Sequence, residues 1–98
     1  MQFVVPPDHP ALPGHFPGRP VVPGVVVLDR VLDAIERDHG ALGALRLPLV
    51  KFMQPLLPGE VADINVESLD AHPGESGRWR FRVSRAGVQI ASGEVVAA

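Results

Sequence analysis

Residues 15–29 read HFPGRPVVPGVVVLD, and this stretch decides how the chain is organised. Its first half holds a histidine, His15, among prolines and glycines, which restrict the backbone and keep it out of regular helices and strands. Its second half begins at Gly24 and is apolar, and a carboxylate, Asp29, follows five residues later. The stretch therefore predicts a constrained loop that leads directly into the first turns of a helix.

The loop extends from this stretch back toward the N-terminus. Prolines cluster from Pro6 to Pro23, so we predict an extended, irregular loop over residues 6–23. Loops of this length are uncommon in compact domains and are mostly functional or disordered. Apolar side chains within it indicate that it packs and is functional; they are Ala11, Leu12, Phe16, Val21 and Val22.

A helix is predicted from Gly24 to about His39. Leu28, Val31, Leu32 and Ile35 recur at spacings of three and four residues, and charged residues occupy the other positions. The apolar run 25–27 predicts that the first turn is buried on every side. Gly40 is the expected end of the helix, because glycine is favoured just after a helix C-terminus.

Strand patterns follow the helix. The segments 45–57, 61–66, 79–83 and 88–96 are apolar or alternate with polar residues, and turns rich in proline and glycine separate them. Gly93 is expected to mark a bulge. Arg78, Arg80 and Arg82 alternate with apolar residues and predict a solvated sheet face, with carrier-protein docking as the second interpretation. We predict an α+β fold with one long helix on an antiparallel sheet.

Composition excludes several functional classes. The 98 residues predict one domain, 1–98, and 46% of them are hydrophobic, which is ample for a small core and favours burial against another subunit. A formal charge of −2 gives no basic footprint for nucleic acid or anionic membranes. Without cysteine, disulfides and thiolate catalysis are excluded. No segment reads as a signal peptide or membrane span, so we expect a cytoplasmic protein.

The motifs resemble those of a known family. His15-Phe16-Pro17-Gly18-Arg19-Pro20 with Pro23-Gly24 is similar to the signature of the (3R)-hydroxyacyl-acyl-carrier-protein dehydratases. Lys51-Phe52, Pro55 and Pro58-Gly59-Glu60 are similar to a second segment of that family, and the resemblance extends from about Pro10 to Val96. Within the group, the chain looks most like the short dehydratase-like proteins of aryl polyene gene clusters. The resemblance implies a hotdog fold, in which the sheet wraps a central helix, and a double-hotdog dimer.

The resemblance also implies roles for individual residues. His15 corresponds to the base that removes the C2 proton of a 3-hydroxyacyl thioester. Asp29 corresponds to the acidic partner, which protonates the departing hydroxyl directly or through a water that it orients. Gly24 corresponds to the glycine whose N–H binds the thioester carbonyl, with Phe16, Pro23 and Val25 expected beside the substrate. In the family, the base and the acid of one site come from the two chains of a dimer. The implied partner is acyl carrier protein, and neither a cofactor nor a metal is implied.

The expected chemistry agrees with these residue types. Imidazole titrates near pH ~6.5, so a neutral histidine can act as a base at cytoplasmic pH. A backbone N–H at a helix N-terminus can stabilise the negative charge that develops on the thioester oxygen. Asp29 has to be buried to hold a proton at neutral pH. The expected activity is dehydration to a trans-2-enoyl thioester in fatty acid or polyene biosynthesis.

Two positions depart from the family pattern. Asp33 stands where the family usually has glutamine, and Arg30 stands where a small residue usually follows the carboxylate. Two aspartates one helical turn apart would repel each other if both were buried, unless Arg30 or Arg37 paired with one of them. These changes leave two alternatives open, a hotdog acyl thioesterase and a catalytically impaired subunit that binds acyl carrier protein.

The simpler interpretations remain open as well. His15 could stabilise the loop by local hydrogen bonds, and Asp29 could simply favour the helix dipole and face solvent. Asp8, His9 and His15 could be grouped as metal ligands, but their spacing matches no known ligand pattern, and no metal site is predicted.

Overall fold

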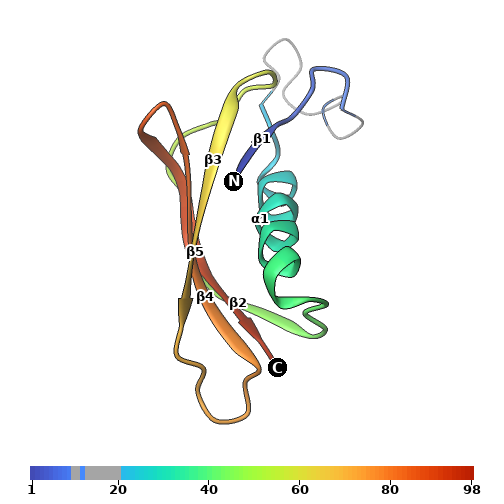
Figure 1. The fold of residues 1–98 in the computed structure, drawn as a ribbon. Helices are drawn as coiled ribbons and strands as arrows, with labels where there is room; N and C mark the ends of the chain where they lie inside the picture. Colours follow the sequence, from blue (N-terminus) through green and yellow to red (C-terminus); the bar gives the residue numbers. More distant parts are fainter. Residues whose placement is uncertain (10–11, 13–20) are drawn as a thin grey trace.

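The computed structural model describes residues 1–9, 12 and 21–98 of the chain. In this part of the chain, one helix lies along one face of a five-stranded antiparallel sheet (Figure 1). No helix among the described residues is long and apolar enough to span a bilayer. The elements are, in chain order, β1 (Gln2–Val4), α1 (Gly24–His39), β2 (Leu45–Phe52), β3 (Val61–Leu69), β4 (Gly77–Arg85) and β5 (Val88–Ala97).

The sheet has the strand order β1-β3-β4-β5-β2, and every neighbouring pair is antiparallel. Strands β3, β4 and β5 are consecutive in the chain and pair as hairpins. Strand β2 follows the helix in the chain and pairs with the other side of β5. The sequence did not predict β1, which pairs with residues 61–63 of β3. The α+β arrangement of one helix on an antiparallel sheet is confirmed.

Helix α1 begins and ends where the periodicity predicted. It runs from Gly24 to His39, and Gly40 follows with a φ of 89° and donates its N–H to the Glu36 carbonyl. Val27, Val31 and Ile35 are buried against the sheet. The prediction that the whole first turn is buried is wrong, because Val25 is 64% exposed in the single chain. Val25 lies about half a turn from this buried stripe, so the sheet that covers the stripe leaves it uncovered.

Strand β4 alternates as predicted. Trp79, Phe81 and Val83 are buried in the core, whereas Arg80 and Arg82 are exposed on the opposite face. Fully burying an aromatic or aliphatic side chain contributes about 1.5–3 kcal/mol, so this strand supplies much of the core. The solvated face predicted for the arginines is confirmed for Arg80 and Arg82, whereas the Arg78 side chain is only 17% exposed.

Two expectations for the sheet are wrong. The apolar segment 45–57 predicts Phe52 and Met53 in the core, but they are 52% and 44% exposed at the end of β2, which is an edge strand. Gly93 is in regular register with Phe81, and the register shifts of β5 with its neighbours lie elsewhere, so Gly93 is not a bulge. A Cβ at Gly93 would overlap the Leu49 carbonyl oxygen of β2, so close packing explains this glycine.

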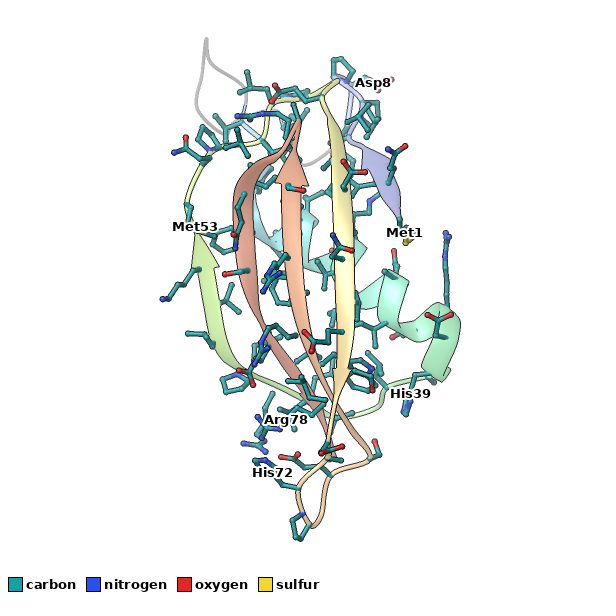
Figure 2. All side chains as sticks on the ribbon, turned by 60° about the vertical axis from the view of Figure 1, so that its left-hand side comes forward. Met1, Asp8, His39, Met53, His72 and Arg78 are labelled. Carbon is teal, nitrogen blue, oxygen red and sulfur yellow. The ribbon has the colours of Figure 1, made fainter. Side chains whose placement is uncertain are left out.

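Charged groups join the β3–β4 turn to the rest of the sheet at the end opposite to β1, near His72 and Arg78 (Figure 2). Glu75 accepts hydrogen bonds from Arg78 and from the His72 backbone N–H, and its carboxylate lies 3.0 Å from the guanidinium of Arg46 on β2. Arg78 also lies 3.1 Å from Glu94. These contacts neutralise Arg78 within the chain, which weakens the interpretation of the arginine stripe as a docking surface.

The Glu75 contacts predict acid-dependent stability. The hydrogen bond from Arg78, followed by that from the His72 N–H, lowers the pKa of Glu75 from 4.5 to about 2. A lowered folded-state pKa contributes stability above the unfolded-state value, and this is lost as the pH falls from about 4.5 to about 2. We therefore expect Glu75→Gln to lower the melting temperature at pH ~7 and the gap to wild type to close by pH ~2.

Thermal unfolding followed by circular dichroism across this pH range tests the prediction. The matched control is Glu67→Gln, because the Glu67 carboxylate lies 3.7 Å from Arg80 and is 63% exposed. Exposed pairs of this kind contribute little, so the control should stay close to wild type throughout. A Glu75→Gln gap that does not depend on pH would contradict the assignment.

Candidate active site

A cavity of about 520 Å³ lies between the start of α1 and the end of β2. One side is formed by residues 21–24 and Val27, and the other by residues 52–56 with Ile90 and Ala91 of β5. Gln54 is the only polar side chain among these lining residues. A mostly apolar cavity with few polar groups is typical of a site that binds a small, largely apolar molecule or acyl group.

The start of α1 faces this cavity without a cap. Pro23 is the N-cap residue, makes no side-chain capping bond, and is followed by a first turn without acidic residues. The Val26 and Val27 N–H groups both donate to the Pro23 carbonyl, at 3.0 and 3.4 Å. Within the described part of the chain, the N–H groups of Gly24 and Val25 have no hydrogen-bond acceptor. The positive end of the helix dipole is therefore available to a ligand oxygen.

Gly24 leaves space that no other residue would leave. A Cβ at this position would lie 2.8 Å from Cζ of Phe52, which is closer than real Cβ contacts come. The Phe52 ring therefore lies directly beside the helix start, and Gly24 and Phe52 both line the cavity. This close packing explains a glycine at position 24, whose binding of a carbonyl through its N–H stays a prediction.

Asp29 lies one turn further along α1 and points away from this cavity. It is exposed in the single chain and is not among the residues that line the cavity. Val25, four residues earlier, shares its helix face. Among the sequence-predicted site residues, Pro23 and Gly24 line the cavity, whereas Asp29 and Val25 lie on the outer face of the helix. His15 and Phe16 lie outside the described residues.

The two departures from the family pattern lie toward β1. The guanidinium of Arg30 sits 5.9 Å from the ring centroid of Phe3, and Asp33 lines a separate hollow with Arg30 and Arg37. Asp33 makes no ion pair with another described residue. Asp29 and Asp33 are both exposed in the single chain, so the repulsion expected between two buried carboxylates does not arise there.

Sequence reasoning did not place the second side of the cavity among the site residues. Phe52, Met53 and Gln54 leave the edge strand β2 and line the cavity, and Figure 2 shows Met53 at the end of that strand. The available signal was the segment from Lys51 to Glu60, whose prolines break the strand pattern. From the sequence, Phe52 and Met53 are expected in the core with an acyl tunnel as the second interpretation, and the cavity lining agrees with the second.

Solved structures with a similar fold include two enzymes of different activity. The dehydratase heterocomplex ApeI:P from Xenorhabdus doucetiae matches with a TM-score of 0.74 and 22% identity, over 99% of this chain and 84% of that chain. A mutant of the fluoroacetyl-CoA-specific thioesterase FlK matches with a TM-score of 0.73 and 18% identity, over 100% and 82% of the two chains. The hotdog fold is thereby confirmed, but a fold alone does not specify the reaction.

Sequence comparison is more specific. The 3-hydroxyacyl-[acyl-carrier-protein] dehydratase FabZ of Bartonella quintana is 31% identical over 103 residues, which cover 92% of this chain and 63% of that enzyme. The FabZ of Chlamydia trachomatis is 36% identical over 70 residues, covering 61% of this chain and 46% of the enzyme. The chain thus spans less than two thirds of these relatives. A family model described as ApeI-like, ApeI dehydratase, matches residues 1–94, and this chain belongs to that dehydratase family.

Proposed function

We propose that this chain removes water from a 3-hydroxyacyl thioester held on acyl carrier protein and releases the trans-2-enoyl thioester. The observation that carries the proposal is the uncapped start of α1, which opens into an apolar cavity at Gly24. A thioester carbonyl bound there would accept a hydrogen bond from the Gly24 N–H, and the acyl chain would lie along the apolar residues of the cavity.

The reaction needs two proton transfers. His15 takes the proton from C2, and the electron pair forms the C2–C3 double bond as the C3–O bond breaks. The developing negative charge on the carbonyl oxygen is stabilised by the Gly24 N–H and the helix dipole. Asp29 donates a proton to the departing hydroxyl, which leaves as water, and exchange with solvent then restores both groups. The thioester itself makes the C2 proton acidic enough for this chemistry.

The proposed site is completed by a second copy of the chain. Asp29 and Val25 do not line the cavity of their own chain, and among the described residues β2 is an edge strand with one side unpaired. Leu47 and Leu49 on β2 are 40% and 45% exposed. Burial of this apolar surface against a second copy favours a homodimer, and it would remove Asp29 from solvent. We propose that the acid of each site is Asp29 of the partner subunit.

An enoyl-forming assay tests the proposed function. Wild type and His15→Ala are each mixed with a short 3-hydroxyacyl-acyl carrier protein, and enoyl absorbance and free thiol are measured in parallel. Enoyl product from wild type, with at least ~10²-fold less from His15→Ala, is the expected result. Thiol release without enoyl product would identify a thioesterase. Binding of the acyl carrier protein without either product would identify an impaired subunit, and either of these results would overturn the proposal.

A further inference from the structure

Arg85, the last residue of β4, reaches across to the segment that forms one side of the cavity. Its Nη1 donates to the carbonyl oxygen of Pro55 at 2.6 Å and lies 3.2 Å from Oε1 of Glu60. The Arg85 side chain is 25% exposed and that of Glu60 is 32% exposed. The charged guanidinium is the donor in both contacts, which strengthens them. Both partners are at least 25 positions away from Arg85 in the sequence.

Besides Arg85, backbone hydrogen bonds and the buried Leu56 hold the segment 53–60 in place. It forms no regular secondary structure, and its two prolines, Pro55 and Pro58, have no N–H to donate. At its start, Met53 and Gln54 donate to the Ile90 carbonyl, and near its end Gly59 donates to the Val5 carbonyl. Between these points, Glu60 accepts a hydrogen bond from the Leu57 N–H at 2.8 Å. Arg85 therefore binds the middle of the segment, directly and through Glu60.

A hydrogen bond connects this segment to the residues just before α1. The Val22 N–H donates to the carbonyl oxygen of Leu56 at 2.8 Å, and Leu56 is buried. Val22 precedes the N-cap Pro23, whose ring fixes its φ, and Gly24 follows at once. A shift of residues 55–57 would therefore move the backbone that presents the Gly24 N–H.

We propose that Arg85 is a positioning residue for the candidate active site: by holding Pro55 and Glu60, it sets the distance between the two sides of the cavity and the direction of the Gly24 N–H. This proposal rests on the proposed dehydration. Misplacement of a reacting group by about 1 Å can lower a rate by about 10²-fold. A partly exposed ion pair, in contrast, contributes little to global stability. Arg85 should therefore matter more to turnover than to folding.

The test compares Arg85→Met with Arg80→Met. Both variants remove one arginine of β4, but Arg80 lies on the outer face of the sheet, 3.7 Å from Glu67, and is 45% exposed. We expect Arg85→Met to lower kcat for dehydration by more than ~10-fold with KM changed less than ~3-fold. Arg80→Met should stay within ~2-fold of wild type. Arg85→Lys retains a cationic donor and should recover much of the lost kcat.

Amide hydrogen exchange gives a readout that does not need activity. In the substrate-free protein, Arg85→Met should speed exchange at the Val22 N–H by at least ~10-fold and leave the core amide of Val83 unchanged. If wild type proves inactive, the proposed function fails while this measurement still tests the role of Arg85. Equal exchange at Val22 in the Arg85 and Arg80 variants would overturn the proposal. A loss of protection throughout Arg85→Met, with no recovery in Arg85→Lys, would also overturn it and make Arg85 a general stabilising residue.

Discussion

Asp29→Asn is expected to lower kcat for dehydration by about 10²–10⁴-fold, the range that general acid–base groups supply. An amide has nearly the shape of the carboxyl group, but its N–H groups are far too weakly acidic to transfer a proton to the departing hydroxyl. Folding should be unaffected, because Asp29 makes no ion pair or side-chain hydrogen bond with another described residue.

The measurement is kcat in the enoyl-forming assay beside the melting temperature of each variant. Asp38→Asn is the matched control, since Asp38 is a second exposed aspartate on α1, near its C-terminal end. A negative charge near the C-terminus of a helix does not interact favourably with the helix dipole, so removing it loses no stabilising interaction. Activity and stability should therefore both stay near wild type. Equal activity of the two variants would mean that Asp29 takes no part in the chemistry. A marked loss of stability in Asp29→Asn would mean that its role is structural.

Local patterns in the sequence were sufficient for most of the secondary structure. The bounds of α1 follow from its apolar spacing and from Gly40, and the alternation in β4 gives its buried face. The pattern could not place β1, which is three residues long and pairs with residues 61–63, far away in the chain. It also failed at Val25, because a run of three valines does not show which of them the sheet will cover.

The candidate site was predictable only where one short motif contains it. Gly24 and Pro23 belong to such a motif, and both line the cavity. The Phe52 ring contacts Gly24 from β2, which follows the helix in the sequence. The position of this ring therefore depends on how α1 packs against β2. Arg85 lies beside a hairpin turn in the sequence, and nothing local indicates that its partners are Pro55 and Glu60. Contacts between segments that are distant in the sequence cannot be predicted from local patterns and become visible only in the folded structure.

Gly93→Ala is expected to lower the free energy of unfolding by about 1–3 kcal/mol, the usual cost of adding a methyl group to a well-packed core. The new Cβ would overlap the Leu49 carbonyl oxygen and lie 2.9 Å from the ring of Phe81. The ring is fully buried and cannot turn away, and the carbonyl belongs to the backbone of β2. Strand β2 must therefore move outward, which weakens its hydrogen bonds to β5.

Urea unfolding at neutral pH measures this effect, with Ser92→Ala as the control at the neighbouring position of β5. That control adds no atom and should cost less than about 0.5 kcal/mol. Phe81→Leu combined with Gly93→Ala separates the two contacts, because a smaller side chain relieves the ring contact but leaves the overlap with the Leu49 carbonyl. We expect the double variant to recover none of the stability lost in Gly93→Ala. Wild-type stability of Gly93→Ala would show that β2 and β5 are further apart at this point. The consequence would extend to the cavity, because β2 ends in Phe52, the ring that packs against Gly24.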